Sequence, residues 1–153
     1  MSIADRLAEL KITLPPAPKP VAAYIPAVRT GSLVFISGQL PLKDGELLAS
    51  GPVPSRVSLE EAQAAARQCV LNALAVLAAQ VGDDLDRVEQ IVRLGVFVCC
   101  EAGFTDQPKV GNGASELLQS IFGEKGRHAR AAVGSIALPL GATVEVEMIA
   151  EVS

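Results

Sequence analysis

Hydrophobic and polar residues alternate with two different periods along this chain, so its pattern predicts both helices and strands. After Ser58, apolar residues return every three or four positions. Glu61 follows Ser58 by three residues, which is typical of a capping box, so we expect a helix that ends near Gln80. Residues 3–12 and 112–122 have the same helical period and predict two further helices.

Short apolar runs rich in β-branched residues predict the strands. They cover residues 21–28, 33–36, 90–100, 129–138 and 143–152. In the last run, valine and methionine alternate with Glu145 and Glu147, which is typical of a strand with one buried face. A hairpin-like turn is expected over residues 43–46.

The order of these elements predicts an α+β fold, with two main helices on one face of a single sheet. With 153 residues, the chain is expected to form one domain over 1–153, in which 1–20 are an N-terminal helix and a proline-rich tether. No second layer of chain remains to cover the other face of the sheet. We therefore expect subunits to associate through that face.

Composition narrows the possible functions. Hydrophobic residues make up 50% of the chain, aromatic residues only 3%, and the net charge is −4, so binding of nucleic acid is not expected. We find no signal peptide and no apolar stretch long enough to cross a membrane, which favours a cytoplasmic location. Three cysteines without paired spacing and one histidine indicate neither a metal site nor a disulfide.

An arginine and a glutamate inside apolar strands are the main candidates for chemistry. Arg130 and Glu145 each need solvent or a partner, because charged residues are costly to bury alone. One interpretation is that Glu145 and Glu147, which share one face of their strand, are simply solvated. The other is that Arg130 binds a small carboxylate and Glu145 positions a water or moves a proton. Since a tight turn at 139–141 separates the two strands, we expect these side chains to meet across a strand pair.

Other polar residues have simpler explanations. Tyr24 is interpreted as a surface or interface ring, and Asn112 as the N-cap of the helix that follows it. His128 is expected to be solvated at the start of a strand. Cys69 falls on the apolar stripe of its helix, so we expect it to be a packing residue.

Several motifs together resemble the RidA/YjgF family, the reactive-intermediate deaminases, over about residues 20–152. They are Ser37-Gly38-Gln39-Leu40-Pro41, Asn72-Ala73-Leu74, Ala129-Arg130-Ala131-Ala132-Val133 and Val144-Glu145-Val146-Glu147. The resemblance implies a chorismate-mutase-like fold and a homotrimer around a central barrel, with clefts between subunits. It also implies hydrolysis of enamines and imines to 2-keto acids and ammonia, with no cofactor.

The resemblance also assigns the catalytic residues. Arg130 matches the arginine that holds the substrate carboxylate, and Glu145 matches the glutamate that positions the attacking water. Tyr24 matches a tyrosine that reaches the cleft from the neighbouring subunit.

Four further residues match positions that line the family's pocket. Ser37 and Gly38 match its serine-glycine pair, and Asn112 matches its asparagine with one residue inserted before Arg130. Ala132 stands where archetypal members carry a cysteine.

Three functions are therefore compared. The first is an imine and enamine deaminase, and the second is a protein that binds a small keto acid without catalysis and has a regulatory role. The third is RNA cleavage, a label sometimes given to this family, which the acidic charge and the scarcity of aromatic rings disfavour.

Overall fold

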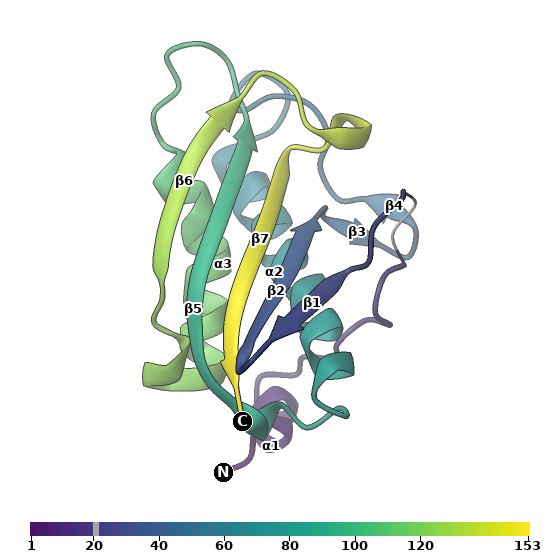
Figure 1. Cartoon of the computed structure of the whole chain (residues 1–153). Helices are drawn as coiled ribbons and strands as arrows, with labels where there is room; N and C mark the ends of the chain where they lie inside the picture. The colour runs from purple at the N-terminus through teal and green to yellow at the C-terminus, as the bar shows by residue number, and fades with distance from the viewer. Residues whose placement is uncertain (20–21) are drawn as a thin grey trace.

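The computed structural model describes residues 1–19 and 22–153, and these form two layers, with the sheet in front of two helices in Figure 1. The five strands lie in the order β1-β2-β7-β5-β6. Their bounds are β1 Ala27–Thr30, β2 Leu33–Gln39, β5 Val88–Cys99, β6 Ala129–Ser135 and β7 Val144–Val152. Only β5 and β6 are parallel. The predicted α+β class, with two main helices on one face, is confirmed.

Smaller elements complete the chain. The helices are α1 Ile3–Glu9, α2 Leu59–Gln80 and α3 Gln107–Phe122, with short 3-10 turns at Leu85–Arg87, Gly123–Gly126 and Pro139–Gly141. A hairpin joins β3 Leu42–Lys43 to β4 Glu46–Leu47, as expected for residues 43–46. Its turn residues Asp44 and Gly45 both have positive φ, which suits a tight hairpin.

Helix α2 is the centre of the core. It begins as predicted, since Ser58 Oγ accepts from the Glu61 amide at 3.1 Å. Its length and composition would allow it to cross a membrane, but most of it is buried, which identifies it as a core helix. Helix α3 packs closely on it at Gly113, where a Cβ atom would overlap the Gln63 carbonyl. This close approach lets both helices lie side by side on one face of the sheet.

The second long helix starts earlier than its sequence pattern predicts. The expected range was 112–122, but α3 begins at Gln107, so Asn112 lies in its second turn and the N-cap interpretation is wrong. Pro108 at the start and two glycines at 111 and 113 disrupt the apolar period there, which conceals the first turn.

Strand boundaries also shift. The first strand, expected over 21–28, is β1 at Ala27–Thr30, and residue 21 lies outside the described residues. The strand expected over 129–138 ends at Ser135, and the one expected over 90–100 begins at Val88.

The expected pairing of the strands that carry Arg130 and Glu145 is wrong. Strand β5 lies between β6 and β7 in the sheet, so these two strands do not pair. The connection from β6 to β7 crosses the end of β5. Arg130 lies opposite Leu94 of β5, whereas Glu145 lies opposite Phe97. Since residues 94 and 97 are an odd number apart, the two charged side chains point to opposite faces. Arg130 faces the helices, and Glu145 faces the uncovered side.

The uncovered face of the sheet carries exposed apolar side chains as well as charged ones such as Glu145 and Glu147. Val28 and Phe35 lie opposite each other on it, and Val133 extends it toward the β6 edge. All three side chains are exposed in the single chain. The helices protect only the other face, so these apolar side chains remain exposed in the single chain.

We expect the chain to self-associate through this face, and Val133→Glu to weaken the assembly. A carboxylate buried between apolar surfaces would be desolvated without a partner. Light scattering at micromolar concentration measures the mass of both proteins.

Leu48→Glu is the matched control, because Leu48 and Val133 are both 47% exposed but Leu48 lies on the helix side, in a groove against α2. A wild-type monomer, or equal masses for both variants, would contradict this expectation.

Candidate active site

Three acceptors on α3 hold the guanidinium of Arg130. Its Nη1 donates to Asn112 Oδ1 and to Ser115 Oγ, both at 3.0 Å. Its Nη2 donates to the Pro108 carbonyl at 3.2 Å. Nε donates to none of the described residues, so Nε and the second Nη2 proton remain for a ligand. A fixed guanidinium with free donors is suited to binding a carboxylate.

Ala132 lies beside this arginine. It is opposite Val96 of β5, two residues after Arg130, so both side chains share the helix-side face as the alternation predicted. Ala132 is half-buried against the core.

Glu145 lies on the opposite face, half-buried on β7. Burial raises the pKa of its carboxyl above the ordinary value, and repulsion from Glu147 raises that pKa further. Glu147 itself pairs with Arg93 at 3.2 Å, whereas Glu145 forms no ion pair within residues 1–19 and 22–153. The two glutamates therefore differ: Glu147 is a partner in a salt bridge, whereas the Glu145 carboxylate has no such partner among the described residues.

A small cavity of about 120 Å³ lies beside Gly38, the glycine that contacts Glu145. Tyr24, Ser37 and Gly38 line it together with Leu140. A Cβ atom at Gly38 would overlap the carboxylate of Glu145, so glycine at this position gives that carboxylate its place. Tyr24 is 51% exposed, which leaves its ring free to contact a ligand or a neighbouring subunit.

Two sets of hydrogen bonds stabilise the cavity wall. Ser37 Oγ donates to the Pro26 carbonyl at 3.1 Å, so the serine joins β2 to the segment that carries Tyr24. The buried Asn72 donates from Nδ2 to the carbonyls of Leu40 and Leu42, at 3.0 and 2.9 Å. Asn72 was noticed in the sequence only as part of a motif, and its structural role is to hold this loop.

The predicted site residues thus form two groups. Tyr24, Ser37 and Gly38 line the cavity, and Glu145 lies against Gly38. Arg130, Asn112 and Ala132 instead lie on the helix side of β6. Arg130 on β6 and Glu145 on β7 are two strand spacings apart, roughly 10 Å across the sheet, and they lie on its opposite faces. One chain therefore does not bring Arg130 and Glu145 to the same ligand.

Comparison with known proteins identifies the family. The sequence profile described as "YjgF/chorismate mutase-like, putative endoribonuclease" matches residues 4–152. The chain belongs to the RidA/YjgF family.

Two relatives show how far this similarity extends. Protein TCP17 of Trypanosoma cruzi is 44% identical over 152 residues, which covers 99% of this chain and 94% of that one. The 2-iminobutanoate/2-iminopropanoate deaminase of Dermatophagoides farinae is 31% identical over 140 residues, covering 90% and 92%.

Solved structures share the fold. Atu1372 of Agrobacterium tumefaciens has a TM-score of 0.90 at 40% identity, and the match covers 99% of this chain and 92% of that one. E. coli TdcF with bound serine has a TM-score of 0.67 at 25% identity, covering 90% and 94%. Members of the family therefore include one that binds a small amino acid.

The sequence pattern did not predict the contact between two further residues, His128 and Ser115. His128 was expected to be solvated, but it is half-buried and lies 2.8 Å from Ser115 Oγ. Ser115 falls among the apolar positions of the α3 pattern, and a polar residue in a buried stripe was the signal available.

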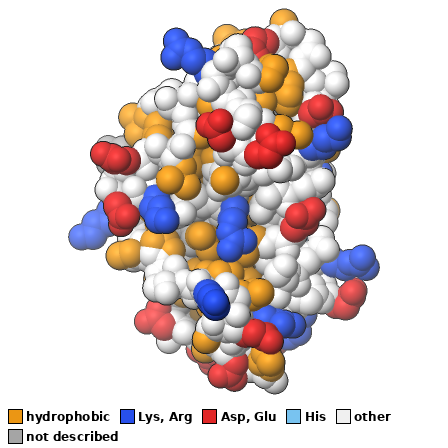
Figure 2. Space-filling model, turned by 180° about the vertical axis from the view of Figure 1, so that it is seen from behind, with side chains coloured by type: hydrophobic (Ala, Val, Ile, Leu, Met, Phe, Trp, Pro, Cys, Tyr) orange, Lys and Arg blue, Asp and Glu red, His pale blue; other side chains and the backbone are white. Residues whose placement is uncertain are grey.

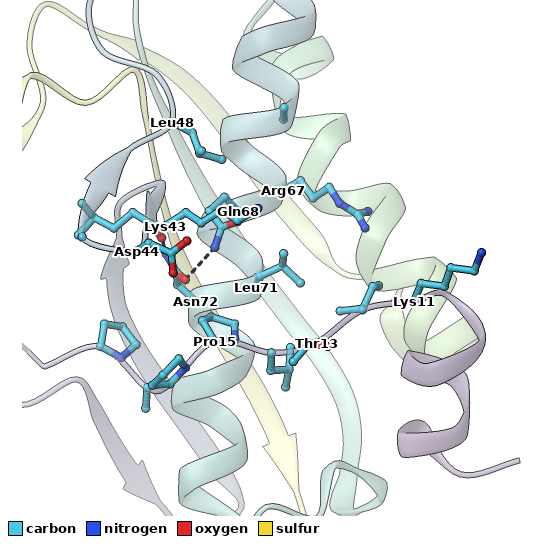
Figure 3. A pocket seen from close by; sticks show the side chains of 18 residues that line it. Lys11, Thr13, Pro15, Lys43, Asp44, Leu48, Arg67, Gln68, Leu71 and Asn72 are labelled. Carbon is cyan, nitrogen blue, oxygen red and sulfur yellow. Dashed lines mark hydrogen bonds between the residues drawn. The ribbon is translucent and has the colours of Figure 1, made fainter.

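A much larger groove lies on the helix side of the chain. It measures about 960 Å³ and lies between the proline-rich segment, the β3–β4 hairpin and α2 (Figure 3). Lys43 and Arg67 lie at its edge, and the molecular surface on this side mixes charged and hydrophobic side chains (Figure 2). The groove shares Pro18, Leu42 and Asn72 with the small cavity but contains none of the predicted site residues. The larger volume of this groove therefore does not make it the candidate active site.

No group of three His, Cys, Asp or Glu side chains able to hold a metal ion occurs among the described residues. Cys69 is fully buried, as its place in the helical pattern predicted, and burial raises the pKa of its thiol.

Glu147→Gln should lower the pKa of Glu145, because it removes the neighbouring negative charge and leaves Arg93 unpaired nearby. NMR titration of the Glu145 carboxyl measures the shift. An unchanged or raised pKa would contradict this account.

The same pKa predicts how stability depends on pH. Folding raises the pKa of Glu145 above 4.5, so the folded chain binds this proton more tightly than the unfolded chain. Its contribution to the free energy of unfolding therefore falls as pH rises above 4.5 through the folded pKa. The Tm of Glu145→Gln should exceed that of the wild type at neutral pH, and the difference should disappear below the ordinary carboxyl pKa.

Proposed function

We propose that this protein hydrolyses small 2-imino acids, and their enamine tautomers, to 2-keto acids and ammonia, in a site shared by two subunits. The observation that carries the proposal is the separation of two complementary groups. Arg130, whose fixed guanidinium has free donors, and the half-buried Glu145 lie on opposite faces of the same sheet. Each group is incomplete alone, and association of subunits would unite the arginine of one with the glutamate of the next.

Known relatives support the substrate class. The Dermatophagoides farinae relative is named a deaminase of 2-iminobutanoate and 2-iminopropanoate. Serine, bound in TdcF, carries the same carboxylate and nitrogen on adjacent carbons as a 2-imino acid. These features match a site with one guanidinium and one carboxyl group.

The chemistry requires few groups. Arg130 would bind the substrate carboxylate through its remaining donors. Water adds to the C=N carbon of the protonated imine and gives up a proton to Glu145, which forms a neutral carbinolamine. Glu145 then returns that proton to the nitrogen. The C–N bond breaks as the carbinolamine hydroxyl passes its proton to Glu145, so a C=O bond forms, ammonia leaves, and Glu145 releases the last proton to ammonia or solvent. A carboxyl group with a raised pKa is suited to both transfers.

The assembly is part of this proposal. A homotrimer in which the uncovered sheet faces line a central barrel would bury Val28, Phe35 and Val133. A reducing, cytoplasmic location suits the three free cysteines that the structure describes.

A coupled assay tests the reaction, with an amino-acid oxidase generating the imine and loss of the imine followed over time. The wild type should accelerate this loss, and Glu145→Gln should lower turnover about 10²-fold or more while keeping the fold. Arg130→Lys should lose most activity despite its charge, because lysine lacks the planar fork. Glu147→Gln is the matched control for the first variant and should retain activity at neutral pH.

The assay also separates the two functions that the sequence left open. Acceleration by the wild type supports the deaminase. Tight binding of a 2-keto acid with no acceleration would replace it with a regulatory protein that binds small carboxylates.

Mixed assemblies test whether the site is shared. Arg130→Ala and Glu145→Gln are each expected to lose most of their activity alone. Refolding an equal mixture should restore about a quarter of the sites, since each site takes its arginine and glutamate from different chains at random. No recovery in properly assembled mixtures would show that both residues act within one chain, contrary to the proposal.

A further inference from the structure

His128 and Ser115 form a hydrogen-bonded pair directly behind Arg130. His128 Nδ1 lies 2.7 Å from the Gly126 carbonyl, and its Nε2 lies 2.8 Å from Ser115 Oγ. Arg130 Nη1 lies 3.0 Å from the same serine oxygen. The three side chains therefore make one continuous network between α3 and β6.

The Gly126 carbonyl decides the direction of each hydrogen bond. A carbonyl only accepts, so Nδ1 of His128 carries the proton and Nε2 is left as an acceptor. Ser115 must then donate its hydroxyl proton to Nε2, which turns the oxygen lone pairs toward Arg130. The arginine thus meets an acceptor whose orientation is already determined.

Burial of Ser115 and His128 favours the neutral form of the histidine. Ser115 is only 7% exposed. Burial lowers the pKa of His128 below its ordinary value, and the positive charge of Arg130 acts in the same direction, against the hydrogen bond to Gly126. A neutral imidazole is the form that can accept from Ser115.

We propose that Ser115 and His128 are positioning residues that hold the Arg130 guanidinium in the orientation needed to bind a substrate carboxylate. This inference rests on the proposed function only in that Arg130 is the carboxylate anchor. Asn112 fixes one proton of Nη1, and Ser115, oriented by His128, fixes the other. The guanidinium plane is then set before a ligand arrives, which reduces the entropy lost on binding.

A different interpretation of the same pair is a serine nucleophile activated by histidine. The contacts favour positioning, because Ser115 is almost fully buried and its oxygen already accepts from Arg130. The interpretations differ in their kinetics, since loss of a nucleophile removes turnover whereas loss of a positioning residue weakens binding.

Ser115→Ala is the central variant, and Ser120→Ala is its matched control. Ser120 lies on the same helix but its hydroxyl donates only to the Glu116 carbonyl. We expect Ser115→Ala to weaken binding of 2-ketobutyrate and to raise KM, each by about 10-fold, with kcat changed far less. NMR relaxation of the Arg130 Nε–Hε group, in protein without ligand, should show greater mobility in Ser115→Ala alone.

Variants of His128 test the direction of the hydrogen bonds. Glutamine can accept from Ser115 through its side-chain oxygen, so His128→Gln should retain much of the binding. His128→Leu offers no acceptor and should behave like Ser115→Ala. NMR of the His128 ring should show the proton on Nδ1.

The outcomes separate this inference from the proposed reaction. If the wild type hydrolyses no imine but Ser115→Ala still weakens keto-acid binding and mobilises Arg130, the reaction is wrong and the positioning role stands. Identical behaviour of Ser115→Ala and Ser120→Ala would overturn the positioning role. A wild type that binds no keto acid would also overturn it. Loss of kcat without loss of binding, together with labelling of Ser115 by a fluorophosphonate, would establish the nucleophile instead.

Discussion

Side chains alternate between the two faces of the sheet, and α2 and α3 pack against only one of them. The helices lie close together because Gly113 lets α3 approach the backbone of α2 at Gln63. Successive residues of each strand therefore face the core and the uncovered surface in turn. The apolar residues on that surface and the separation of Arg130 from Glu145 both follow from this arrangement.

Glycines on neighbouring strands make room for carboxylates on the uncovered face. A Cβ at Gly38 would overlap Glu145, and one at Gly95 would lie 2.6 Å from Glu147 Oε1. Arg93 neutralises Glu147 but not Glu145, whose pKa is raised by burial and by that neighbour. A carboxyl group held in this way lowers stability at neutral pH. Such a cost is common where a residue serves proton transfer rather than folding.

The sequence predicted the helices and strands better than it predicted which of them lie next to each other. Helix α2 was predictable because Ser58 and a long apolar stripe mark it, and alternation placed Arg130 and Ala132 on one face. Which strands pair was not predictable from the short turn at 139–141, because the turn does not show that β5 lies between the strands it joins. The contact between Ser115 and His128 depends on the path of the chain from α3 into β6, so no local pattern reveals it.

Strand β6 lies at the edge of the sheet, where a long side chain has few neighbours to hold it. The parallel crossover from β5 to β6 passes through α3, so this helix necessarily lies over the strand. Pro108, Asn112 and Ser115 are spaced four and three residues apart, which places their acceptors along one stripe facing Arg130. The first of these lies in the helical turn that the sequence pattern concealed. The Arg130 guanidinium is therefore supported by the connecting helix rather than by the sheet, and changes in that helix are the direct way to alter how firmly Arg130 is held.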